Sequence, residues 1–131
     1  MRSSQAPFRY EPGRAYVKRI RRSRYTAIGR IARYTDGLNE AAFSADELVQ
    51  DAVVRNIEVI GEACRNIRRY FPAFVTQHPE VPFQSAYEMR NALTHGYHKI
   101  DFGVVWVTVR EDLPALGKQF ESLAVELKSA S

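Results

Sequence analysis

Hydrophobic and polar positions repeat at helical spacing along most of the chain. The longest pattern begins near Ser44 and Glu47, which form a predicted capping box, and it ends before Pro72. Its apolar residues step by three or four positions: Val49, Val53, Ile57, Ile60, Cys64, Ile67 and Phe71. Charged residues occupy the opposite face: Asp51, Arg55, Glu58, Glu62, Arg65 and Arg69. This pattern predicts a long amphipathic helix whose apolar face packs in a bundle.

Two further helical patterns lie on either side of this helix. The first runs from Arg14 to Tyr34, and Thr35-Asp36-Gly37 is expected to end it, because glycine is a common helix terminator. The second begins at Pro82, which suits a first helical turn, and runs to about His95, with Gly96 ending it. The residues expected to turn inward from this helix are Met89, Ala92 and Leu93.

A final helix is predicted after Asp101, whose carboxylate can cap its first turn. Its apolar stripe continues from Phe102 to Leu123, and a kink is expected near residues 110–113 because Pro114 removes a hydrogen bond and clashes with the preceding turn. No stretch alternates with period two for long enough to require a sheet. The pattern therefore predicts an all-α fold, an antiparallel bundle of four to five helices.

The chain has 131 residues, of which 45% are hydrophobic, enough for one domain with one core. Residues 1–13 carry two prolines and a glycine and are interpreted as a flexible N-terminal arm, which leaves residues 14–131 as a single helical domain. We expect no membrane contact and no secretory signal. Cys64, the lone cysteine, is expected in the core and fits a reducing, cytoplasmic location.

Charge is distributed unevenly along the chain. Up to Arg33 there are ten basic residues and one acidic residue, so this part carries +9, whereas nine basic and fourteen acidic residues give the remainder −5. A basic block of this kind suits a phosphate backbone or an acidic partner. It is equally typical of a solvated helix face, and the count alone does not separate these interpretations.

Residues 90–98 concentrate polar and reactive side chains near the end of the predicted third helix. Asn91 and His95 are four residues apart and share one face, and Arg90 and Thr94 form the neighbouring row. An imidazole can move a proton to or from an RNA sugar oxygen near neutral pH, and a guanidinium can stabilise the charge that builds on a phosphate. Because the RNA 2′-OH is an internal nucleophile, this chemistry needs no metal or cofactor. Two such grooves facing each other across a two-fold axis would supply both a base and an acid.

A structural interpretation of the same residues stays open. Arg90 and His95 can pair with Glu58 or Glu62 on a neighbouring helix, or His95 can stabilise a helix C-terminus through the helix dipole. A zinc site at His95 and His98 is not expected, because no third or fourth ligand lies at useful spacing.

Four blocks of the sequence occur in the order and spacing of a known family. The first runs from Met89-Arg90-Asn91 through His95-Gly96-Tyr97 to Ile100-Asp101, and the others are residues 31–38, 51–63 and 112–114. The first block is similar to the Arg-x4-His-x-Tyr motif of the HepT-like toxins in the HEPN superfamily, and the resemblance covers roughly residues 28–124. Four ordered blocks are more specific than the short motif alone.

The resemblance implies a HEPN-like helical homodimer whose paired grooves form a metal-independent endoribonuclease, the toxin of a type VII (HepT/MntA) toxin–antitoxin system. It implies that Arg90 and His95 are the catalytic pair and that Asn91 assists them. It also implies that the nucleotidyltransferase antitoxin MntA silences the toxin by transferring AMP to Tyr97. A nucleotide there would place bulk and negative charge at the mouth of a phosphate-binding cleft.

The first helix departs from the family, because Arg21, Arg22 and Arg24 stand where relatives commonly have acidic or apolar residues. With Thr94, these arginines are predicted to bind RNA. The leading hypothesis is therefore an RNA endonuclease toxin. The alternative is a non-catalytic module that binds nucleotide or RNA and scaffolds a partner nucleotidyltransferase. A purely structural dimer that hides His95 from solvent is the third hypothesis.

Overall fold

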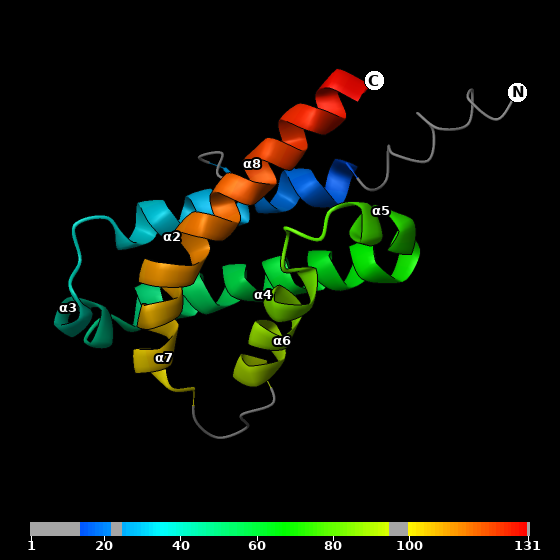
Figure 1. Cartoon of the computed structure of the whole chain (residues 1–131). Helices are drawn as coiled ribbons and strands as arrows, with labels where there is room; N and C mark the ends of the chain where they lie inside the picture. Colours follow the sequence, from blue (N-terminus) through cyan, green and yellow to red (C-terminus); the bar gives the residue numbers. More distant parts are fainter. Residues whose placement is uncertain (1–13, 22–24, 95–99, 131) are drawn as a thin grey trace, which may run out of the picture.

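The computed structural model describes residues 14–21, 25–94 and 100–130, with the backbone alone at Thr94 and residues 128–130. Regular structure in this part of the chain is entirely helical, which confirms the predicted all-α fold (Figure 1). Residues 14–20 are helical. They are followed by α2 (Ala27–Thr35), α3 (Glu40–Ser44), α4 (Glu47–Tyr70), α5 (Pro72–Gln77), α6 (Phe83–Thr94), α7 (Phe102–Val107), the π-helical segment η2 (Thr108–Asp112) and α8 (Leu113–Ala130).

The first predicted helix is divided, which corrects the expectation of one helix from Arg14 to Tyr34. Arg21 lies in a bend, Tyr25 lies in a turn, and α2 begins only at Ala27. Both pieces nevertheless bury apolar residues at helical spacing: Val17 and Ile20 in the first, and Ile28 and Ile31 in α2. The end of α2 is as expected: Gly37 follows it with φ +76°, a conformation that glycine adopts without strain.

The start of the long helix α4 differs from the predicted capping box. Ser44 ends the separate short helix α3, and Asp46 is the N-cap of α4, where its carboxylate accepts a hydrogen bond from the backbone N–H of Val49 at 3.1 Å. Gln50 then donates to the carbonyls of Phe43 and Ser44, both at 2.9 Å. The first turn of α4 is thus hydrogen-bonded to the end of α3, whereas a capping box forms bonds only within the start of one helix.

The core follows the predicted stripes. Val53, Ile57, Ile60, Cys64 and Ile67 of α4 are all fully buried. Helix α4 packs against α2, α3, α5 and α6, and Figure 1 shows it running beneath α2 and α8 and behind α6. Aromatic pairs close the two ends of the core: Phe43 with Trp106 at 5.2 Å between ring centroids, and Phe83 with Phe120 at 5.7 Å. The expected core position of Cys64 is confirmed, and burial raises the pKa of its thiol to about 12.

The last predicted helix is confirmed with its cap and its interruption. The carboxylate of Asp101 accepts hydrogen bonds from the backbone N–H groups of Gly103 and Val104, at 3.0 and 3.2 Å. Where the kink was expected, the helix changes to the π-helical segment η2, which ends two residues before Pro114, whose ring cannot continue an ordinary helical hydrogen-bond ladder. In the third predicted helix, α6, Leu93 is buried and Met89 is half-buried, but Ala92 is exposed, which corrects its predicted inward position.

Helix α5 was not predicted as an element of its own. Together with α3 and the division of the first helix, it brings the number of helical elements above the four to five that were predicted. A buried histidine ties α5 to α8: His78 Nδ1 donates to the carbonyl of Phe74 at 2.9 Å, and Nε2 lies 2.5 Å from Glu126 Oε2. Burial lowers the pKa of His78, but hydrogen bonds to Glu126 and Phe74 and the negative charges of Glu126 and Glu80 outweigh it, so the pKa is raised above its ordinary value.

Within the described residues, no helix is both long and apolar enough to cross a membrane.

Candidate nucleic-acid site on α4 and α6

Arg90 lies where α6 packs most closely against α4. A Cβ atom added to Gly61 of α4 would meet the Cβ of Arg90 and would lie only 2.6 Å from its Cγ. No side chain larger than hydrogen therefore fits at position 61 unless one of the two helices moves. Glycine at this position lets the stem of Arg90 cross directly over the backbone of α4. The guanidinium is thereby delivered to the outer, charged face of α4.

Glu62 and Asn91 both contact the guanidinium of Arg90. Its Nη2 lies 3.6 Å from Glu62 Oε2, and its Nη1 donates to Asn91 Oδ1 at 3.1 Å. Glu62 also binds Arg65, whose Nη1 lies 3.2 Å from Oε1, so the two oxygens of one carboxylate serve two arginines. The Arg90 side chain as a whole remains 27% exposed, although its Nε atom is buried. The pairing of Arg90 with Glu62 is the one that the structural interpretation anticipated.

Tyr87 extends this polar cluster by one turn of α6. The pKa of its phenol is lowered, chiefly by a hydrogen bond to Asn91; burial opposes this, and the positive charges of Arg65 and Arg90 and a hydrogen bond to Arg65 add to the lowering. The guanidinium of Arg68 lies over the Tyr87 ring, 5.9 Å from its centroid. Arginines interleaved with an aromatic ring and an amide are chemistry suited to a nucleotide chain, which offers phosphates and bases together.

A pocket of about 340 Å³ opens beside Arg90. Three elements form it: helix 14–20 contributes Arg19, α6 contributes Arg90, and the outer face of α4 forms the floor. The floor residues are Arg55, Glu58, Val59, Glu62 and Ala63. Three guanidinium groups and two carboxylates thus surround one solvent-open space, and the arginines outnumber the glutamates. Such a pocket favours an anion.

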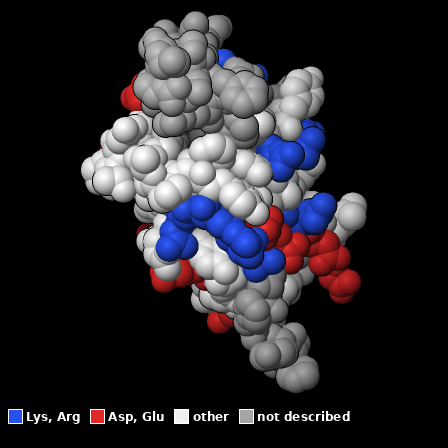
Figure 2. Space-filling model, turned by 90° about the vertical axis from the view of Figure 1, so that its right-hand side faces the viewer, with Lys and Arg blue, Asp and Glu red and all other residues white. Residues whose placement is uncertain are grey.

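Basic residues also gather outside the pocket. Figure 2 shows the molecule from the side of α5 and the end of α4, where Lys and Arg side chains form a band with acidic side chains beside it. Helix α4 alone carries Arg65, Arg68 and Arg69 in its last turns. The positive character that the sequence assigned to the first helix is therefore shared with the C-terminal turns of α4.

The sequence-predicted site residues are only partly described. Arg90 and Asn91 lie together on α6, as the helical spacing predicts. His95, Tyr97, Arg22 and Arg24 lie outside the described residues, and Thr94 ends α6 with its side chain not described. Arg21 is half-buried in a bend and is not among the residues that line the pocket.

Sequence reasoning missed four residues of this cluster: Gly61, Arg19, Arg55 and Tyr87. Arg55, Glu58 and Glu62 already stood together on the charged face of the predicted helix, and their spacing of three and four residues was the available signal. Within the part of the chain that the structure describes, no three His, Cys, Asp or Glu side chains gather as a metal site would require.

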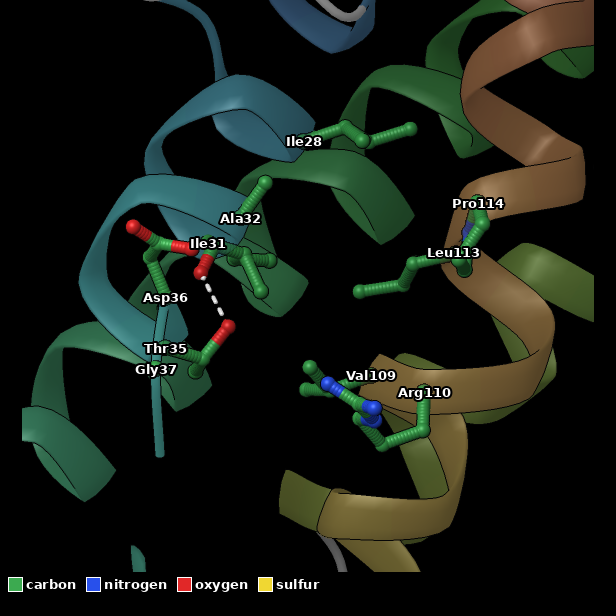
Figure 3. Close-up of a pocket in the computed structure, with 10 residues that line it drawn as sticks. All are labelled: Ile28, Ile31, Ala32, Thr35, Asp36, Gly37, Val109, Arg110, Leu113 and Pro114. Carbon is green, nitrogen blue, oxygen red and sulfur yellow. Dashed lines mark hydrogen bonds between the residues drawn. The ribbon is translucent and has the colours of Figure 1, made fainter. Parts of the chain in front are cut away.

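A second pocket, of about 290 Å³, lies between α2 and the η2–α8 segment (Figure 3). Its wall is mostly apolar: Ile28, Ile31, Ala32, Val109, Leu113 and Pro114. The hydroxyl of Thr35 is used within its own helix, donating to the carbonyl of Ile31 at 2.8 Å, and Arg110 extends from η2 toward α2. This pocket offers one cation against one carboxylate, Asp36, so it is a weaker anion site than the pocket at Arg90.

The chain is similar to proteins of one family. A family model described as "Ribonuclease HepT-like" matches residues 25–123. The "Probable ribonuclease HepT" of Thermococcus cleftensis is 40% identical over 97 residues, which are 74% of this chain and 86% of that protein. "Putative RNase MJ0125" of Methanocaldococcus jannaschii is 31% identical over 75% of this chain and 82% of its own length.

A longer protein of the same archaeon carries a second activity in its name. "Gamma-glutamylcyclotransferase and putative RNase MJ0434" of Methanocaldococcus jannaschii is 34% identical over 77% of this chain but only 44% of its own length. No solved structure gives a significant match. The family model spans α2 to α8, including the Gly61–Arg90 crossing and the residues of the motif block. The chain therefore belongs to the HepT-like ribonuclease family.

Proposed function

We propose that the protein is a metal-independent RNA endonuclease and that Arg90, Asn91 and His95 form its catalytic groove. The observation that carries this proposal is the Arg90 guanidinium, held by Glu62 and Asn91 at the edge of a solvent-open pocket rather than in the core. It stands on the helix that leads into the motif, five residues before His95. The relatives named as ribonucleases support the same activity.

In the proposed reaction the 2′-oxygen of one nucleotide forms a bond to the adjacent phosphorus as the bond from phosphorus to the 5′-oxygen breaks. His95 accepts the proton of the 2′-OH, and Arg90 stabilises the negative charge on the phosphate oxygens. The leaving 5′-oxygen needs a proton, which His95 of a second copy supplies in a homodimer with facing grooves. The products are a 2′,3′-cyclic phosphate end and a 5′-hydroxyl end.

We further propose that the protein acts as the toxin of a type VII (HepT/MntA) pair in the cytoplasm, with residues 14–131 folding as one HEPN-like domain after a flexible arm. Silencing by an MntA-type nucleotidyltransferase would occur through AMP on Tyr97. Intact-mass spectrometry of protein co-expressed with its neighbouring gene tests this. The expected mass gain is a multiple of one AMP and disappears in Tyr97→Phe; an unmodified but inactive complex would contradict it.

RNA cleavage by the purified protein in the presence of EDTA tests the endonuclease. His95→Ala and Arg90→Ala are expected to lose at least a hundredfold in rate, since each removes a group that acts in the transition state. His98→Ala, a histidine three residues further on, is the matched control and is expected to cleave like the parent. If His95→Ala cleaves as fast as the parent, the catalytic assignment is wrong.

A second candidate function is a non-catalytic module that binds RNA or nucleotide and scaffolds a partner nucleotidyltransferase. The Arg90–Glu62 pair favours it, because an arginine engaged by a carboxylate can have a purely structural role. This candidate predicts that RNA is retarded in a gel but never shortened, and that added salt abolishes the retardation. Parent protein that produces cyclic-phosphate ends would exclude it.

A further inference from the structure

The Arg90 pocket contains two arginines that the proposed reaction does not use. Arg19 enters from helix 14–20 and Arg55 rises from the outer face of α4, and both side chains are exposed. Arg19 is stacked on Tyr16, with its guanidinium 5.5 Å from the ring centroid, which restrains it beside the pocket. Helix 14–20 is itself held in place, because Arg14 donates to the carbonyl of Leu127 in α8 at 2.8 Å.

The ion pairs around the pocket are unevenly shared. Glu62 is occupied by Arg65 and Arg90. Among the residues that the structure describes, no ion pair joins Arg19 or Arg55 to a carboxylate. Glu58 lines the same pocket and lowers its positive potential without neutralising it. Two arginines therefore line this open pocket next to the arginine proposed to bind the scissile phosphate.

The size of the pocket suits a backbone phosphate. A volume of about 340 Å³ leaves room for a phosphate group and some of its waters. Guanidiniums bind phosphate oxygens through charge-assisted hydrogen bonds in a forked geometry. A nucleic-acid chain that places one phosphate at Arg90 carries further phosphates on either side of it. Arg19 and Arg55 are neighbouring cations on the pocket wall that can bind one of them.

We propose that Arg19 and Arg55 bind a second backbone phosphate of the RNA whose scissile phosphate is bound by Arg90. This inference rests on the proposed ribonuclease function and deepens it, because it assigns the path of the substrate over α4 and helix 14–20. Arg19 precedes the residues matched by the family model, which begin at residue 25. Part of the binding site thus belongs to the segment that distinguishes this chain from the family pattern.

The test compares Arg19→Ala, Arg55→Ala and the double variant with the parent. The matched control is Arg33→Ala, which removes an exposed arginine of α2 that is also stacked on a tyrosine, Tyr34, at 5.0 Å, but does not line the pocket. Cleavage of a short single-stranded RNA gives KM and kcat, and binding is measured at several salt concentrations in a His95→Ala background, so that the RNA stays intact. Thermal unfolding shows that each variant is folded.

Each pocket substitution is expected to weaken RNA binding about tenfold at low salt, with most of the loss in kcat/KM appearing in KM. The slope of log Kd against log salt should fall by about 0.7 in the double variant, the value for one phosphate contact on a single strand, and by a part of that in each single variant. Glu58→Gln should act in the opposite direction and tighten binding by about two- to fivefold, because it removes a negative charge that faces the phosphate.

Two outcomes would overturn the assignment but not the proposed nuclease activity. In the first, the parent cleaves RNA and the double variant has the same KM and salt slope as the parent. In the second, the Arg33→Ala control loses as much affinity as the pocket variants. The second outcome would show that overall charge, not the pocket, attracts RNA. A parent that neither binds nor cleaves RNA would remove the proposed function and this subsite together.

Discussion

Replacing Gly61 with alanine adds a methyl group at the point where the Arg90 stem crosses α4. The added carbon would lie 2.6 Å from Arg90 Cγ and 3.3 Å from Cδ, whereas carbon atoms in contact are normally about 3.5–4.0 Å apart. The nearest atoms of Arg90 belong to the start of its side chain and cannot rotate away. Because the added carbon lies still closer to Arg90 Cβ than to Cγ, the two helices must separate locally by roughly 1.5 Å.

The free energy of unfolding should fall as a result. Overpacking of this kind costs about 1–3 kcal/mol, and the better helix propensity of alanine returns about 0.5–1 kcal/mol. The expected net loss is about 1–2 kcal/mol, which for a domain of this size lowers Tm by about 3–10 °C. The effect on catalysis should be larger, because a displacement of about 1 Å in a catalytic group costs on the order of a hundredfold in rate.

Thermal unfolding by circular dichroism and RNA cleavage, the latter measured well below Tm, separate the two effects. Gly103→Ala is the control: it is a helical glycine whose added methyl would meet only carboxylate oxygens, Asp101 Oδ1 at 3.2 Å and Glu40 Oε2 at 3.9 Å. We expect its Tm and cleavage rate to stay close to those of the parent. A Gly61→Ala protein that retains both Tm and kcat would show that Arg90 is not positioned by this contact.

Three further predictions concern the remainder of the fold. Asp101→Ala should lower the free energy of unfolding by about 1 kcal/mol in urea titration, because it removes the cap of α7. Glu126→Gln should remove stability that the parent holds below about pH 6.5 and loses as pH rises through the raised pKa of His78; Tm measured from pH 5.5 to 8.5 checks this, and identical profiles would contradict it. Cys64 should react with Ellman's reagent only after unfolding, since its pKa of about 12 and its burial keep it a thiol.

Elements whose signals are local were predictable from the sequence. The apolar stripe of α4, the glycine after α2 and the cap at Asp101 depend on residues within a few turns, and each is found as predicted. The break in the first helix was not predicted, because the interruption of the apolar spacing between Ile20 and Ala27 is compatible both with one continuous helix and with a break. The cap of α4 was misassigned for a related reason: both Ser44 and Asp46 can cap, and the fold of α3 uses Asp46.

The candidate site divides in the same way. The sequence by itself determined that Arg90 and Asn91 stand side by side on a helix and that Arg55, Glu58 and Glu62 share the charged face of another. Only the tertiary structure decided that these faces meet, because their approach depends on a missing Cβ at Gly61 and on helix 14–20 packing close enough to bring in Arg19. Periodicity specifies which side of a helix is buried, but the partner that covers the edge of that side is chosen by packing between residues far apart in the chain.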